Sequence, residues 1–291
     1  MVASARLAAM AACLWCAAGV AWAGASDVFY ERAVMVAADS RCRLFSPGIS
    51  TALAAGKAQA RGAALRTGAD ATALFRLERQ AVATGGSAAC GSAGLKTAAG
   101  RVQAGFEGYR RLSRIDLPGE VAGWRAVRAV PAKGQAWRLS QPVRFGADRA
   151  VFGVYGGSSG GLGAAAAFTD GRVPYAARLV VRDPARAPSA YLRGWKPGAK
   201  PPLAARTPPA SAARTFLAET RSAAEPMLAP QPKDRALLFR FPAGAASALS
   251  GLDPREAVTV EFLFTGRSGD TVRRAYVEVG DFAAGLAFLR L

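Results

Sequence analysis

The C-terminal stretch carries the clearest folding pattern in this chain of 291 residues. Apolar residues alternate with mostly polar ones over 258–264, and this period of two predicts a strand with one buried face. Glycine, serine and aspartate at 266–270 favour a turn, and a second alternating run follows over 272–279. Asp281 can then cap a short closing helix whose apolar residues recur at helical spacing. The sequence therefore predicts a hairpin and a helix against which the preceding β-rich half must pack.

The N-terminus has the pattern of an export signal. Arg6 supplies a positive charge, residues 7–20 form an apolar run, and Ala21-Trp22-Ala23 is a small-x-small cleavage site. We therefore expect residues 1–23 to be a signal peptide and the mature protein, starting near Gly24, to be periplasmic or secreted. An uncleaved N-terminal anchor is the alternative. No later segment reaches the roughly 18 uninterrupted apolar residues of a membrane span.

Two cysteines remain after the expected cleavage, Cys42 and Cys90. In an oxidising compartment such a pair predicts one disulfide bond, with two unrelated buried thiols as the alternative. Cys42 lies at the end of the first expected helix and Cys90 just before the fourth. A bridge would therefore tie the first helix of the N-terminal half to the last.

The net charge of +18 has two explanations. Arginine far outnumbers lysine, and histidine and asparagine are absent, which is typical of GC-rich codon usage without a functional demand. A basic surface could instead bind anionic lipid headgroups or polysaccharide. Nucleic acid is not expected as the partner of an exported protein.

Residues 24–115 are expected to form a helical domain. Ser46-Pro47 is an N-cap followed by proline at the first helical position. Residues 67–70 resemble a capping box that could start a third helix, which Gly85-Gly86 is expected to end. Residues 95–109 carry the most regular helical apolar stripe in the chain. Four helices with one disulfide form the expected N-terminal bundle.

The period changes in residues 116–291, where many short alternating runs are separated by turn residues. This pattern predicts an antiparallel β-sandwich-like domain and an α+β fold overall. Prolines at about 196–234 predict a long surface loop with one short helix near 212–223. Besides the C-terminal pair, the expected strands lie at about 137–145, 150–155, 164–168, 176–182 and 236–241.

Within residues 237–291, Phe239, Phe241, the alternation over 258–264 and the step Gly280-Asp281-Phe282 form a recognisable pattern. It resembles the C-terminal part of the invasion-associated locus B family of alphaproteobacterial periplasmic proteins. The resemblance implies a periplasmic β-rich protein without enzymatic activity. The cysteines of that family in this region have no counterpart here.

One motif has the form of a catalytic signature. Residues 157–161 fit G-x-S-x-G, with Ser159 in the place of a nucleophile. The absence of histidine excludes a Ser-His-Asp triad, so a hydrolase would need a lysine as its base, and the lysines available nearby in sequence are Lys133, Lys196 and Lys200. A glycine-rich turn between strands is the simpler interpretation.

Metal and carboxylate chemistry have little support. Zinc needs histidine or clustered cysteine, and the chain offers neither, so no metal or cofactor is expected. Glu261 and Glu278 could be cross-strand neighbours and so imitate a catalytic pair. Solvated carboxylates beside Arg273 or Arg274 are the ordinary outcome of such a pattern.

The remaining candidate site is a basic surface. Arginine presents a planar fork that suits phosphate and carboxylate groups. The arginines that fall on the polar side of the expected strands, and that would form one basic face if those strands share a sheet, are Arg138, Arg144, Arg178, Arg182 and Arg240. The sequence favours an exported, non-enzymatic binding or structural protein of the cell envelope, with a histidine-independent serine hydrolase using Ser159 as the alternative.

Overall fold

The computed structural model describes residues 24–129, 133–156, 160–231, 233–266 and 269–290. Four helices come first and two antiparallel sheets follow, so the predicted α+β class is confirmed. None of the helices in these ranges combines the length and the hydropathy needed to cross a bilayer. The four helices are α1 (Ala25–Cys42), α2 (Pro47–Arg66), α3 (Ala71–Ser87) and α4 (Ala93–Arg110).

The helix boundaries follow the local sequence signals closely. Pro47 opens α2 as expected. The carboxylate of Asp70 accepts a hydrogen bond of 2.8 Å from the backbone of Ala73, so Asp70 itself caps α3. The prediction that Gly85-Gly86 ends this helix is wrong. A Cβ atom on Gly85 would lie 2.3 Å from the carbonyl oxygen of Val34, so glycine is needed there because α1 and α3 approach closely.

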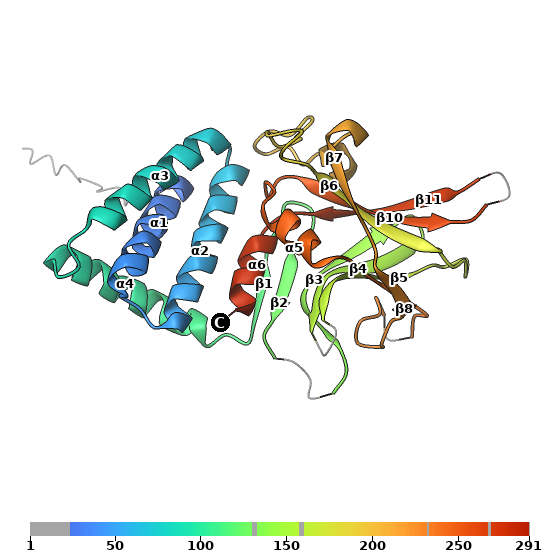
Figure 1. Ribbon diagram of the computed structural model, residues 1–291, viewed down its shortest axis with the longest axis horizontal. Helices are drawn as coiled ribbons and strands as arrows, with labels where there is room; N and C mark the ends of the chain where they lie inside the picture. Colours follow the sequence, from blue (N-terminus) through green and yellow to red (C-terminus); the bar gives the residue numbers. More distant parts are fainter. Residues whose placement is uncertain (1–23, 130–132, 157–159, 232, 267–268, 291) are drawn as a thin grey trace, which may run out of the picture.

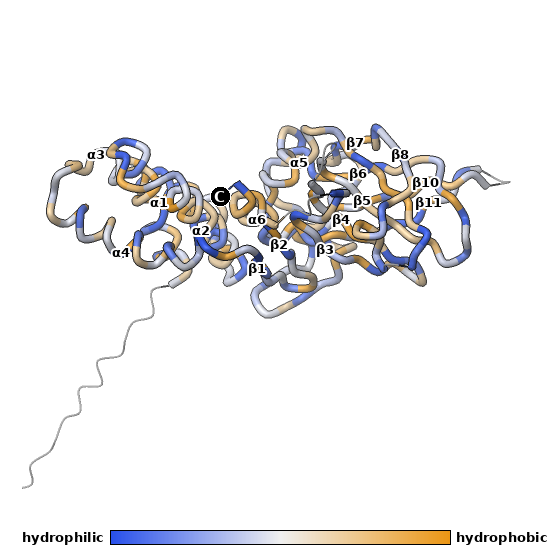
Figure 2. The backbone as a smooth tube through the Cα atoms, turned by 90° about the horizontal axis from the view of Figure 1, so that it is seen from below, coloured by the Kyte–Doolittle hydropathy of each residue, from blue (hydrophilic) through white to orange (hydrophobic). Residues whose placement is uncertain are grey.

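The helices of the bundle are arranged in the order α3, α1, α2, α4, each packed on the next. The predicted disulfide is confirmed, with an S–S distance of 2.01 Å between Cys42 and Cys90. It holds the start of α4 against the end of α1. The outer face of α2 packs on the C-terminal helix α6 (Phe282–Leu289), which lies between the bundle and the strands (Figures 1 and 2).

The C-terminal half is a sandwich of two antiparallel sheets, as predicted. In spatial order the larger sheet comprises β1 (Arg114–Leu117), β2 (Trp124–Val127), β3 (Ala136–Phe145), β4 (Asp148–Gly156), β5 (Gly161–Ala167), β9 (Leu237–Arg240) and β8 (Thr220–Ala223). The smaller sheet comprises β11 (Thr271–Glu278), β10 (Ala257–Phe264), β6 (Ala176–Arg182) and β7 (Ala213–Leu217). A short helix, α5 (Ala243–Ser250), follows β9.

Aromatic rings fill the space between the sheets. Phe145 of β3 stacks on Phe262 of β10 with 5.5 Å between ring centroids, and Phe168 meets Phe262 edge-to-face at 5.2 Å. At the opposite side of the core, Trp124 contacts Phe282 of α6 at 5.0 Å. The helix α6 is therefore part of the β core as well as the surface on which α2 rests.

The strand registers define two ends of the sandwich. The proximal end faces the helical bundle and carries α6. The distal end points away from the bundle and comprises the β3–β4, β5–β6, β8–β9 and β10–β11 connections. The β10–β11 hairpin extends on this side in Figure 1. The two ends differ in how their charges are used.

The proline-rich segment differs from expectation. The short helix expected near 212–223 is wrong, because β7 and β8 occupy that stretch and pair with β6 and β9. The segment also contains the short 3-10 helix η1 (Leu203–Arg206), in which Arg206 is fully buried. The described prolines of this segment are tolerated because they lie in the connections before β7 and after β8, outside the strands, where no ladder hydrogen bond is lost.

Candidate functional site

The five candidate arginines do not form one basic face. Arg138 and Arg144 lie on β3 and Arg240 lies on β9, all in the larger sheet, whereas Arg178 and Arg182 lie on β6 in the smaller one. The condition for a shared face is therefore not met, since the strands belong to two layers of the sandwich. Each arginine has to be considered by its own contacts.

Arg182 is an internal side chain. Its guanidinium makes a two-point ion pair with Glu256, at 2.7 and 3.0 Å, and donates to the carbonyl oxygen of Ala187. The Arg182 and Glu256 side chains are 6% and 1% exposed. Arg182 is thus saturated and cannot meet a ligand.

The other buried arginines of the proximal end are used in the same way. Arg206 donates to Glu120 at 2.6 Å and to the carbonyl oxygen of Pro201. Arg255 pairs with Asp253 at 2.8 Å, and its third nitrogen lies 3.3 Å from the carbonyl oxygen of Leu65 in α2. The arginines Arg182, Arg206 and Arg255, called here the proximal arginines, tie the β domain together and to the helical bundle.

A further ion pair crosses between the two halves of the chain. Arg66 of α2 donates to both carboxylate oxygens of Asp281, at 2.9 and 3.2 Å. Asp281 stands at the start of α6 but makes no side-chain cap hydrogen bond, so the expected cap is wrong and the carboxylate serves Arg66 instead. Burial raises the pKa of Asp281, and the Arg66 guanidinium offsets only part of that rise.

The two glutamates considered as a carboxylate pair are separated. Glu261 faces Arg274 and Arg178 across its neighbouring strands and accepts a hydrogen bond from each, at 2.8 and 2.5 Å. Burial acts to raise the pKa of Glu261, but these two arginines together hold it below its ordinary value. Glu278 is fully buried, and its carboxylate accepts hydrogen bonds from the backbone N–H groups of residues 120–122. The expectation that Glu278 is solvated is therefore wrong.

The last three candidates differ in their contacts. Arg138 donates to the carbonyl oxygen of Val127 at 2.8 Å, and Arg240 lies 3.5 Å from Glu219. Arg144 is exposed and has no hydrogen bond or ion pair with any residue that the structure describes. Of the five, Arg144 alone keeps its whole guanidinium available.

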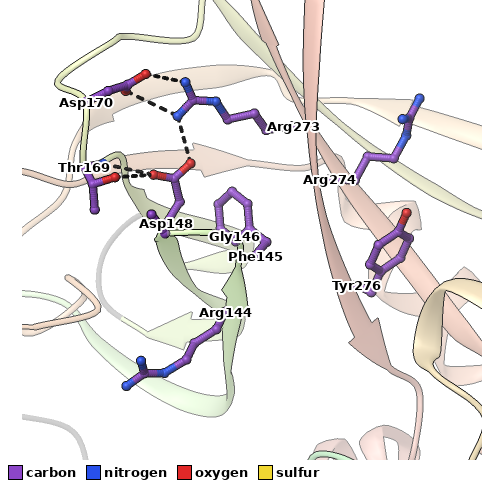
Figure 3. Close-up of a pocket in the computed structure, with 10 residues that line it drawn as sticks. Arg144, Phe145, Gly146, Asp148, Thr169, Asp170, Arg273, Arg274 and Tyr276 are labelled. Atoms are coloured by element: carbon purple, nitrogen blue, oxygen red, sulfur yellow. Dashed lines mark hydrogen bonds and ion pairs between the residues drawn. The ribbon is translucent and has the colours of Figure 1, made fainter.

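Arg144 lies at a hollow of about 650 Å³ between the β3–β4 turn and β11, at the distal end (Figure 3). On the other side of this hollow Arg273 donates to Asp148 at 2.8 Å and forms a close ion pair with Asp170. The hydrogen bond from Arg273 lowers the pKa of Asp170. Both acids of the hollow, Asp148 and Asp170, are therefore neutralised by Arg273. Arg144 points away from these three residues in Figure 3 and pairs with neither acid.

A second hollow of about 680 Å³ adjoins the first, with Thr169 in the lining of both. Lys233 and Arg235 line it, are exposed, and have no hydrogen bond or ion pair within the described residues. Its one acid, Asp234, lies 3.7 Å from Arg149. We call Arg144, Lys233 and Arg235 the distal cluster. Sequence patterns alone did not indicate Lys233 and Arg235, since these residues lie in the connection between β8 and β9 and not in a strand.

The described part of the chain gives no support to a metal site. No group of three or more histidine, cysteine, aspartate or glutamate side chains there could hold a metal ion. Ser159 lies outside the described residues, as does the expected signal peptide at 1–23. The serine-hydrolase alternative stays a prediction, which labelling of Ser159 by a fluorophosphonate probe would test.

No protein-family model, curated protein or solved structure matches this chain. The resemblance of residues 237–291 to the invasion-associated locus B family therefore stays a prediction. The function has to be inferred from the charges and hollows of the molecule itself.

Proposed function

We propose that this is an exported, non-enzymatic binding protein of the cell envelope that holds an anionic polysaccharide at the distal end of its β-sandwich. The observation that carries the proposal is the distal cluster: three exposed cations with no hydrogen bond or ion pair to a described residue, beside hollows whose acids lie in ion pairs. Export is supported by the signal-like N-terminus and by the disulfide, which persists in oxidising compartments. Membership of the invasion-associated locus B family is part of the same proposal.

A polysaccharide fits this arrangement better than a bilayer. The cations are distributed over two adjoining hollows, which a flexible chain can follow and a flat headgroup surface cannot. Uronic-acid carboxylates match the planar fork of Arg144 and Arg235. Tyr276, in the lining of the first hollow, adds an aromatic edge against which a sugar ring can lie.

The test is the affinity for polygalacturonate, with neutral dextran as the ligand control. The distal variant carries Arg144→Gln, Lys233→Gln and Arg235→Gln. Its matched control carries Arg76→Gln, Arg79→Gln and Lys96→Gln. These changes remove two arginines and one lysine from exposed positions of the helical bundle whose side chains make no hydrogen bond or ion pair with a described residue.

We expect the distal variant to bind about tenfold more weakly, since three exposed charge contacts contribute roughly 0.5 kcal/mol each. The control variant should bind nearly as the parent does, and added salt should weaken the parent through screening over about 8 Å. Equal losses in both variants would show that net charge alone attracts the polymer. Binding to vesicles of anionic phospholipid without binding to polygalacturonate would contradict the choice of ligand.

A further inference from the structure

The helical bundle contains an apolar groove that is separate from the distal end. It is lined by α1, α2 and α4 and by Thr84 of α3, and has a volume of about 470 Å³. This volume is within the range of small-molecule sites of about 300–1,000 Å³. Met35 and Leu53 form its floor and are 7% and 0% exposed. The apolar side chains around the groove are Val34, Met35, Leu53, Ala98, Val102 and Phe106.

On α4 the lining of the groove includes a glycine, Gly105, with open space beside it. A Cβ atom on Gly105, which lines the groove, would meet no other atom within 4 Å. The next residue, Phe106, lies against Gly56 of α2, where a Cβ atom would come within 2.8 Å of the ring. The helix α4 is thus held on α2 by Phe106 and at its start by the Cys42–Cys90 bridge, while its Gly105 side stays open.

The charged residues in the lining are Glu31, Arg32 and Arg101, so the lining carries a net charge of one positive unit. One guanidinium nitrogen of Arg32 donates a hydrogen bond of 2.6 Å to the carbonyl oxygen of Gly56. The guanidinium carbon lies 5.6 Å from the centroid of the Phe106 ring. Arg101 is exposed and has no hydrogen bond or ion pair with a described residue. An apolar groove whose lining carries this net charge complements a ligand with one apolar chain and one negative charge.

We propose that this groove binds a long-chain fatty acid. Its acyl chain lies along Met35, Leu53 and Phe106, and its carboxylate meets Arg101 with Arg32 beside it. A helix of another protein does not fit the observations, because a stable protein interface buries more than about 1,000 Å² and the groove is of small-molecule size. A phosphate dianion would exceed the net charge of the lining.

Two matched glycine substitutions test the site. Gly105→Leu places a side chain in the groove where nothing obstructs it, and Gly100→Leu makes the same change on an exposed part of α4 that does not line the groove. Both changes favour helix formation, so neither is expected to unfold the bundle. The measurement is displacement of dansyl-labelled undecanoate by palmitate from the full exported chain.

We expect Gly105→Leu to weaken palmitate binding by about tenfold or more, since leucine occupies the volume in which the acyl chain would be buried. Gly100→Leu should bind as the parent does. Absence of palmitate binding by the parent, or equal affinity in both variants, would overturn the proposal.

The head group is tested separately. Arg101→Gln should weaken palmitate binding and leave hexadecanol binding unchanged, whereas Glu31→Gln should strengthen palmitate binding by removing a like charge. Equal affinity of the parent for palmitate and hexadecanol would overturn the assignment of the carboxylate to Arg101. These results do not depend on the distal cluster, so the polysaccharide proposal can fail while this one holds, and the reverse.

Discussion

The proximal end of the β-sandwich buries its arginines in ion pairs, whereas the distal end, beside the paired Arg273, also has exposed arginines. At the proximal end Arg182 and Arg206 are 5% and 0% exposed and saturated by carboxylates and carbonyl oxygens. At the distal end Arg144 and Arg235 are exposed and have no such partners among the described residues. An excess of arginine in the sequence therefore says little about binding. The available guanidinium groups are identified only by where the fold leaves them without partners.

The comparison makes an energetic distinction. A buried ion pair has lost its hydration, so removing one partner leaves an uncompensated buried charge. An exposed cation is solvated in any case, and its removal changes stability little. The two ends should consequently separate when stability and binding are measured on the same variants.

The largest effect is expected for Arg182→Met, which leaves the carboxylate of Glu256, 1% exposed, without its positively charged partner. We expect the free energy of unfolding to fall by about 3–5 kcal/mol, measured by chemical denaturation. Arg144→Gln is the matched distal change and should cost under about 0.5 kcal/mol. Similar losses in the two variants would remove the distinction between the ends.

The disulfide gives the next largest effect. Replacing both Cys42 and Cys90 by serine should lower the free energy of unfolding by about 2–4 kcal/mol, because the bridge restricts the unfolded chain over a sequence separation of 48 residues. Thiol alkylation and mass spectrometry of exported protein should find neither cysteine free. Two alkylated thiols in that material would contradict the bridge.

A smaller effect concerns the ion pair between the two halves of the chain. The pKa of Asp281 is raised above its ordinary value of 3.8 by burial, against the opposing effect of Arg66. The folded state therefore binds this proton more tightly than the unfolded state does. The stability that this proton contributes is fully present below pH 3.8 and is lost as the pH rises through the pKa of the folded state. Above that pKa, this group causes no further change in stability with pH.

Denaturation at a series of pH values checks this sign. Asp281→Asn should remove the fall in stability over that window, while Arg66→Gln should move the fall to higher pH, since it deletes the group that lowers the pKa. A parent whose stability rises with pH in the window, by an amount that Asp281→Asn abolishes, would show that Arg66 outweighs burial.

The parts of the fold that sequence predicted are those set by local signals. Ser46-Pro47 fixed the start of α2, and alternation located β3, β10 and β11. The short strands β1, β2, β7 and β8 were not predicted: they have four or five residues each, too few for a period to be recognised, and they lack the continuous apolar residues that indicated the equally short β9. The strand character of residues 213–223 comes from pairing with β6 and β9, which are distant in the sequence.

The candidate site was predicted only in part. Arg144 was identified because it alternates with Val143 and Phe145 along a strand. Lys233 and Arg235 follow no periodicity, and nothing in the sequence shows that their connection reaches Arg149 at the start of β4. The buried state of Arg182 was equally invisible, since a polar position in a strand pattern does not reveal that the chain folds over it. Partner choice among charged groups is a property of the tertiary fold.

The most direct test of the distal site is the position of the bound polymer on the protein. Amide chemical shifts should be followed by nuclear magnetic resonance while oligogalacturonate is added to the protein. We expect the perturbed amides to lie beside Arg144, Thr169 and Arg235, with the proximal end and the helical bundle unchanged. Perturbations that concentrate on the helical bundle, or that scatter evenly over all exposed cations, would contradict the account.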